Sequence, residues 1–213
     1  MSKSKQTALL KSVAPFTGAD TKASIIQILN TVIPFLLLWG SAYASLRVSV
    51  WLSLAVSIAA AGFFIRMFII FHDCTHRSFF RSGRANRIWG NITGILTLFP
   101  FEKWKHDHAI HHAASGNLDR RGTGDVWVMT VEEYTRAAWY VKLAYRLYRN
   151  PFVMFGLGPF YLILIDNRLN HRGAPARERW NTHLTTAAAL ILYGGIAALT
   201  GWQAFLLVQL HIW

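Results

Sequence analysis

The chain has 213 residues, of which 53% are hydrophobic and only 15% are charged. A soluble globular domain carries about 25% charged residues, so this composition excludes an ordinary water-soluble domain and favours a protein embedded in lipid. Lysine and arginine total 22 against 10 acidic residues, a net charge of +12, and beside long apolar runs this excess indicates a membrane surface rather than nucleic acid as the partner.

The first long apolar runs predict a transmembrane hairpin. Residues 23–46 and 48–71 are each long enough to cross a bilayer, which takes about 20 helical residues. Arg47 is the only charged residue between them and marks the expected tip of the hairpin. We therefore divide the chain into a polar N-terminal segment, residues 1–22, and a membrane domain, residues 23–213.

The later apolar runs differ in length. Residues 88–101 and 152–165 are too short for a full crossing and predict re-entrant or interfacial segments. Residues 184–207 are long, apolar and uncharged, and they predict a third span. Between these runs, residues 132–149 mix aromatic, apolar and basic positions, a pattern typical of a basic amphipathic helix at the membrane surface.

Basic residues predict how these segments are oriented. Twelve lysines and arginines lie in 72–150, four in 1–24 and four in 166–183, against one at the hairpin tip. Because basic residues gather in cytoplasmic loops, the N-terminus and the loops after the second span are expected in the cytoplasm. The sequence thus predicts an all-α, multi-pass integral membrane protein, with a transmembrane hairpin, a third span and a cytoplasmic helical cap.

Histidines are concentrated in two short stretches of this cap, HDCTH and HAIHH. Five of the nine histidines of the chain lie there: His72, His76, His108, His111 and His112. In a helix, the i,i+4 and i,i+3 spacing within each stretch places the imidazoles side by side. A lone membrane-proximal histidine is usually just hydrogen-bonded, and one HxxxH alone is weak, but the two clusters together predict a metal site.

The ligand type narrows the chemistry. Imidazole suits Zn, Cu, Fe and Ni, and five histidines exceed the three protein ligands of a typical catalytic zinc site, which favours more than one metal. The HExxH pattern of metalloproteases is absent. The lone cysteine, Cys74, lies within the first cluster but off its histidine face, so we interpret it as a small buried filler. An all-nitrogen, polynuclear site at a membrane surface favours oxygen chemistry on a lipid-soluble substrate.

The two clusters resemble a known family. HDCTHRSFF (72–80) and WKHDHAIHHAASGNLDRRGTGDVW (104–127) are similar to the membrane fatty acid desaturases, closest to the acyl-lipid Δ12/ω-6 group, and the resemblance runs from about residue 30 onward. It implies that the five histidines ligate a non-haem di-iron centre, with no catalytic residue beyond the ligands. It also implies that O2 is used to introduce a cis double bond into a membrane lipid or acyl substrate, with electrons from ferredoxin or cytochrome b5.

The chain departs from the family pattern downstream. The family has a third histidine cluster, HxxHH, whereas the remaining histidines, His171, His183 and His211, form no such motif, and the first two are expected as solvated loop residues. We therefore expect the chain to lack the C-terminal part with the third cluster. Two alternatives stay open: a related di-iron hydroxylase or ketolase acting on fatty acids or carotenoids, or a truncated non-catalytic membrane fragment. A zinc transporter is weaker, because the long runs contain no acidic residue.

Acidic residues near the clusters have candidate supporting roles. Asp73 and Asp107 could hydrogen-bond the outer nitrogen of a liganding histidine, a common arrangement at metal sites. Asp119 and Asp125 could do the same or could pair with the two arginines that follow Asp119. His106 lies about 200° around the helix from His108, and the interpretation leaves it outside the metal set.

Overall fold

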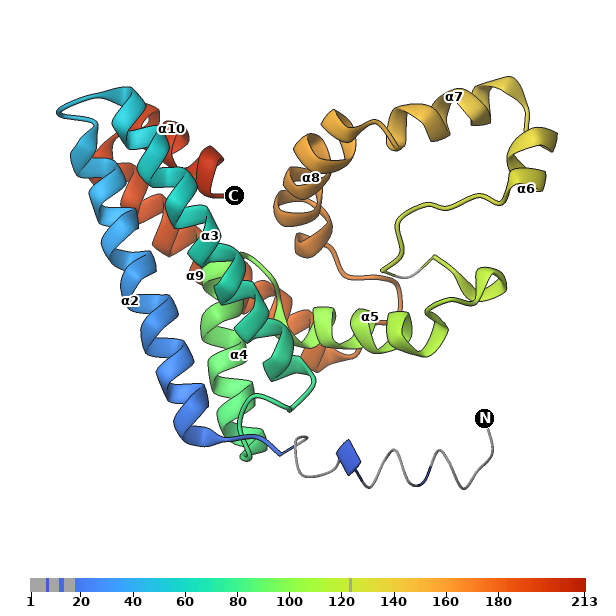
Figure 1. Cartoon of the computed structure of the whole chain (residues 1–213), viewed down its shortest axis with the longest axis horizontal. Helices are drawn as coiled ribbons and strands as arrows, with labels where there is room; N and C mark the ends of the chain where they lie inside the picture. The colour runs from blue at the N-terminus through green and yellow to red at the C-terminus, as the bar shows by residue number, and fades with distance from the viewer. Residues whose placement is uncertain (1–6, 8–11, 14–17, 123) are drawn as a thin grey trace. The chain divides into compact units, whose positions relative to one another are not determined.

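The computed structural model describes residues 7, 12–13, 18–122 and 124–213 (Figure 1). These residues are mostly helical and contain no strand, which confirms the all-α prediction. The predicted polar segment 1–22 lies largely outside the described residues. The chain forms two compact units, one running up to Thr97 and including Leu199–Ile212, and the other comprising Leu98–Ala198 with Trp213.

The first unit is built on the predicted hairpin. Helices α2 (Thr21–Ser45) and α3 (Val50–Thr75) run antiparallel (Figure 1). At 1.5 Å per residue, each is about 38 Å long, more than the roughly 30 Å hydrocarbon core of a bilayer. Both are apolar enough to span a membrane. The side chain of Asp20 caps α2 by accepting hydrogen bonds from the backbone N–H groups of residues 22 and 23.

Aromatic and polar contacts hold this unit together. Phe35 is fully buried between Trp39 and Phe64, at ring-centroid distances of 5.2 and 6.2 Å. Trp39 Nε1 donates a 3.0 Å hydrogen bond to Oε1 of the buried Gln209, on helix α10 (Trp202–Ile212). A buried indole or amide without a partner would be costly, so this bond fixes α10 against the hairpin.

Helix α4 (Gly83–Thr97) covers most of the short run 88–101. Its 15 residues give a length of about 22 Å, less than a bilayer core. Asn86, only 1% exposed, ties it to the preceding turn: its amide accepts from Phe80 N at 2.9 Å and donates to Phe80 O at 2.7 Å and Ser82 O at 3.0 Å. The buried Asn86 side chain therefore fixes the start of the helix to the backbone of Phe80 and Ser82.

The third candidate span begins earlier than the sequence predicts. Helix α9 runs Ala176–Thr200 and is long and apolar enough to cross a membrane, whereas the predicted run was 184–207. Its first two turns are polar, so hydropathy misses them, yet arginine and glutamate are good helix formers. Gly201, with φ of +82°, ends α9, because glycine adopts this left-handed conformation without steric cost, and α10 follows.

The second unit consists mainly of short helices after α5 (Phe101–Ala114). They are η2 (Leu118–Arg120), α6 (Val131–Arg136), α7 (Trp139–Tyr148), the π-helix η3 (Phe152–Leu157), α8 (Gly158–Leu164) and η4 (Asp166–Arg168). The unit also contains most of α9. The predicted short apolar segment 152–165 is thus a π-helix and a short α-helix joined end to end.

The amphipathic segment 132–149 is two helices rather than the single one predicted. Ala137 and Ala138 are extended between α6 and α7. Alanine favours helix, so the break comes from contacts across the corner: Arg146 Nε donates to Tyr134 Oη at 2.6 Å, and Lys142 Nζ donates to Thr135 O at 2.8 Å. Tertiary contacts therefore override local propensity here.

Polar contacts from Lys103 and Glu102 anchor α5 in the second unit. Lys103, 6% exposed, donates through Nζ to the backbone oxygen and the Oδ2 of Asp166, at 2.9 and 2.8 Å. The backbone N–H of Glu102 donates to Asn181 Oδ1 at 2.8 Å, and the Glu102 carboxylate pairs with Arg177. Both of the last partners lie on α9, so the start of α5 is fixed to the start of α9.

Candidate metal centre

The first histidine cluster lies at the end of α3. His72 is in the last turn and His76 is the C-cap residue, so both keep helical backbone geometry. Their Nε2 atoms are 3.3 Å apart and their ring centroids 4.6 Å apart. The i,i+4 spacing therefore pairs the two imidazoles as predicted, and Cys74 between them is buried, in line with its expected role as a filler.

Asp73 orients the first of these rings. Its Oδ1 lies 3.0 Å from Nδ1 of His72, the nitrogen that faces away from His76. An Nδ1–H group donating to this carboxylate leaves Nε2 as the nitrogen with a free lone pair. The tautomer is inferred from the contact, which is the arrangement that the sequence predicts for Asp73.

The second cluster lies in α5, where His108 and His112 form an equivalent pair. Their Nε2 atoms are 3.0 Å apart and the ring centroids 4.4 Å apart. Trp104, one turn earlier, stacks on His108 with a centroid distance of 4.1 Å and an interplanar angle of 25°. The indole limits the rotation of the His108 ring and so supports its alignment with His112.

His111 is held separately from this pair. Its ring centroid is 6.0 Å from that of His108 and 5.8 Å from that of His112. Its Nδ1 lies 2.9 Å from Oδ1 of Asp125, close enough for an ion pair but without the alignment of a hydrogen bond. Gly124, with φ of +74°, lets the chain approach this ring: an added Cβ would lie 3.0 Å from the His111 Cβ.

Asp107 and Asp119 differ from Asp125 in their contacts. Of the alternatives that the sequence left open for Asp125, the histidine contact is the one observed, while Arg121 instead pairs with Glu133. Within the part of the chain that the structure describes, neither Asp119 nor Asp107 makes a polar contact with a histidine. The role predicted for Asp107 stays a prediction.

Each histidine pair has a geometry that suits a metal ion. Metal–imidazole bonds are about 2.1 Å long, so two nitrogens on one ion are about 3.0 Å apart at a right angle and about 3.4 Å apart at a tetrahedral angle. The pairs, at 3.3 and 3.0 Å, fall in this interval. One Nε2–H donating to the other nitrogen would give similar distances without a metal. Imidazole donors fit iron as well as zinc or copper.

Helix α5 also contributes a histidine to an arrangement that the sequence interpretation missed. His106 and His171, both left outside the metal set, lie next to Glu178, at 3.3 and 3.6 Å between Nδ1 and the carboxylate oxygens. The three residues are far apart in sequence and form no spacing motif. The only sequence signal was a histidine on the opposite face of α5 from His108.

Known proteins identify the family. Residues 49–213 match the family described as fatty acid desaturase. A protein named fatty acid desaturase from Bacillus subtilis is 58% identical over 205 residues, covering 96% of this chain and 58% of its own length. An sn-1 acyl-lipid omega-3 desaturase (ferredoxin) from a Synechocystis species is 32% identical over 147 residues, covering 66% of this chain and 39% of its own length.

The chain belongs to the fatty acid desaturase family. This confirms the resemblance drawn from the two histidine clusters. A third relative, an sn-1 oleoyl-lipid 12-desaturase from Synechocystis, is 30% identical over 152 residues. The chain spans between about two fifths and three fifths of the length of these relatives. No solved structure matches it.

Proposed function

We propose that this chain is part of a membrane desaturase that introduces a cis double bond into an acyl chain, with O2 as the oxidant and a non-haem di-iron centre. His72, His76, His108, His111 and His112 are the proposed iron ligands from this chain. The observation that carries the proposal is the pairing of Nε2 atoms in both clusters, at 3.3 and 3.0 Å, in a member of the fatty acid desaturase family.

The chain's own residues would prepare these ligands. Asp73 holds the outer nitrogen of His72, and Asp125 lies against that of His111. Such contacts fix ring orientation and make the imidazole a stronger donor. Trp104 stacks on His108 and limits its rotation. The ligands are therefore oriented by their neighbours before any ion binds, which lowers the cost of assembling the site.

Bound iron would supply O2 activation. In the overall reaction, two hydrogens leave adjacent carbons of the acyl chain. These hydrogens, with two electrons from a donor and two protons, reduce O2 to two waters. The protein's part is to hold the ligands and admit the chain from the lipid. Helices α2, α3 and α9 are the membrane-crossing candidates. Exposed apolar side chains along them, such as Leu37, Ile58 and Leu190, are suited to contact with acyl chains.

The electron donor would be a separate protein. One relative carries ferredoxin in its name, and either ferredoxin or cytochrome b5 would serve the proposed reaction. We further propose that the N-terminus and both histidine clusters lie in the cytoplasm. The support is the excess of basic residues in 1–24 and 72–183 and the shortness of α4, which is absent from the candidate spans.

The product of the reaction tests this function. The chain would be expressed in a bacterial host that makes only saturated acyl lipids and supplies a reduced ferredoxin, and the fatty acids would be analysed by mass spectrometry. We expect monounsaturated chains with wild type and none with His108→Ala/His112→Ala at equal membrane levels. His183→Asn, an exposed histidine on α9, is the matched control. Hydroxylated chains would contradict a desaturase, and saturated chains alone from well-expressed protein would favour the truncated, non-catalytic alternative.

A further inference from the structure

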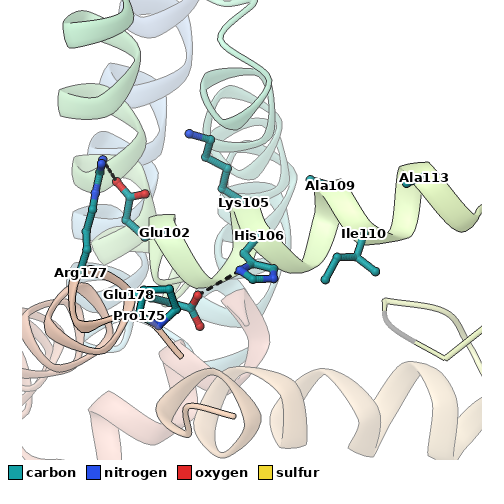
Figure 2. A pocket seen from close by; sticks show the side chains of 9 residues that line it. All are labelled: Glu102, Lys105, His106, Ala109, Ile110, Ala113, Pro175, Arg177 and Glu178. Carbon is teal, nitrogen blue, oxygen red and sulfur yellow. Dashed lines mark hydrogen bonds and ion pairs between the residues drawn. The ribbon is translucent and has the colours of Figure 1, made fainter. Parts of the chain in front are cut away.

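His106, His171 and Glu178 come together from three parts of the second unit. His106 lies on α5, Glu178 in the first turn of α9, and His171 in the loop before it. One donor atom from each lies within 4.8 Å of the other two. Figure 2 shows His106 pointing at the Glu178 carboxylate from across a pocket. The three side chains thus face one point.

The carboxylate of Glu178 is in an unusual position. Its side chain is only 4% exposed, yet Oε1 makes no hydrogen bond among the described residues. A buried carboxylate is costly unless it is paired or coordinates a metal. Arg177, a positively charged side chain of the pocket wall, pairs with Glu102 instead. Because Oε1 has no hydrogen bond in the described part of the chain and lies 3.6 Å from Nδ1 of His171, a cation held between the three side chains would neutralise this buried carboxylate.

We propose that His106, His171 and Glu178 bind a Zn²⁺ ion, separate from the iron ligands of the proposed function. Two imidazoles and one carboxylate are the protein ligands of several zinc enzymes that keep a fourth position open. The Nδ1-to-carboxylate distances of 3.3 and 3.6 Å are near the roughly 3.4 Å between donors on a tetrahedral ion with bonds of about 2.1 Å. Small rotations of the two exposed histidines would close the site.

The open coordination position would face the adjoining pocket, which has a volume of about 520 Å³. Its wall combines apolar residues of α5, among them Ala109 and Ile110, with the charged Lys105 and Arg177 (Figure 2). A water or a small anion can reach the ion from this side. The site is distinct from the second histidine cluster, because His106 is about 200° and 120° around α5 from His108 and His112.

The metal content of the purified protein tests this proposal directly. The full chain, purified in detergent and stripped with a chelator, would be equilibrated with buffered Zn²⁺, and bound zinc would be counted by mass spectrometry. The variants are Glu178→Gln, which keeps the buried side chain's shape, and His171→Asn. We expect each to lose one zinc equivalent, or to raise the dissociation constant by at least about tenfold. His183→Asn, on the same helix as Glu178, should bind as wild type does.

Two further measurements separate the outcomes. Co²⁺ in place of zinc should give the visible bands of a four-coordinate ion in wild type, and these should disappear in Glu178→Gln. If Glu178→Gln unfolds, as judged by its thermal transition, His106→Asn serves instead, because that side chain is 42% exposed. Equal zinc content in wild type and these variants would overturn the proposal. His108→Ala/His112→Ala should keep this zinc, so failure of the iron site is distinguishable.

Discussion

Oδ1 of Asp125, which follows η2, lies 2.9 Å from Nδ1 of His111 on α5. The sequence allowed Asp125 to pair with a neighbouring arginine, but Arg121 is engaged by Glu133. Asp125 thereby contacts the outer nitrogen of a proposed iron ligand. Asp73 does the same for His72, so one carboxylate supports a ligand in each histidine cluster.

Removing these carboxylates should weaken metal binding without removing a ligand. We expect Asp125→Asn and Asp73→Asn each to lower iron affinity about 10- to 100-fold, because an amide orients and polarises an imidazole less well than a carboxylate does. Iron titration of the detergent-purified chain measures this. Asp119→Asn, an exposed position on η2 six residues before Asp125, is the control. Iron affinities equal to wild type in both variants would show that the carboxylates are not used.

Gly124 offers a test of how tightly His111 is held. With φ of +74° and an added Cβ only 3.0 Å from the His111 Cβ, Gly124→Ala should both strain the backbone, by about 1–2 kcal/mol, and displace the ring. Gly116 is a close control, since its φ is +81° but no atom lies within 4 Å of an added Cβ. Gly116→Ala should therefore show a similar loss of unfolding free energy and normal iron content.

The comparison between these two glycine variants isolates the contact with His111. Iron content and the thermal transition would be measured for both. We expect iron loss in Gly124→Ala alone. Equal iron content in Gly124→Ala and Gly116→Ala would mean that the position of His111 does not depend on this turn.

Asn86 should be a main determinant of stability in the first unit. Asn86→Ala removes three hydrogen bonds and takes away the side-chain partner of the backbone N–H and carbonyl groups of the buried Phe80, a cost of about 1–3 kcal/mol. Unfolding in detergent mixtures, followed by circular dichroism, measures the free energy. Arg84→Ala, an exposed position on the same helix, should change it little. If Asn86→Ala lost as little unfolding free energy as Arg84→Ala, the Asn86 hydrogen bonds would not stabilise this unit.

The α6 region should respond to acid. The pKa of Glu133 lies below its ordinary value of 4.5. The largest cause is the hydrogen bond from Arg121, and hydrogen bonds from the backbone and side chain of Thr130 and the charge of Arg121 add to it. Because the folded-state pKa is the lower one, this contribution to stability is present above pH 4.5 and is lost as the pH falls through the folded-state pKa. Since the carboxylate is exposed, the effect is small.

An NMR titration of labelled glutamate measures this pKa. Arg121→Gln should move the midpoint of Glu133 back up, toward the ordinary value, whereas Arg136→Gln, whose partner is the neighbouring Glu132, should leave it in place. An unchanged midpoint in Arg121→Gln would mean that the ion pair does not form in solution.

Sequence patterns predicted the parts of the fold that depend on local chemistry. The hairpin spans followed from long apolar runs, the second interrupted only by Arg66, and the pairing of His72 with His76 and of His108 with His112 followed from helical periodicity. The start of α9 was missed because its first turns are charged. These turns are held by tertiary contacts, such as Arg177 with Glu102, which hydropathy cannot register.

Contacts between distant segments account for the other differences. The break between α6 and α7 depends on the hydrogen bond from Arg146 to Tyr134. The alanines at the break favour helix, so the sequence did not predict it. His106, His171 and Glu178 carry no spacing signal, because they come from a helix, a loop and a second helix. The contact between Asp125 and His111 depends on the backbone of Gly124, whose conformation the glycine permits but does not dictate.

Iron stoichiometry of the chain purified in detergent tests the central claim most directly, alongside a variant with His108, His111 and His112 all changed to Ala. We predict iron bound in wild type, approaching two ions per chain, and its loss in the variant with helical content unchanged. Little or no iron in both, from folded protein supplied with Fe²⁺ under reducing conditions, would contradict the claim that these histidines form an iron centre.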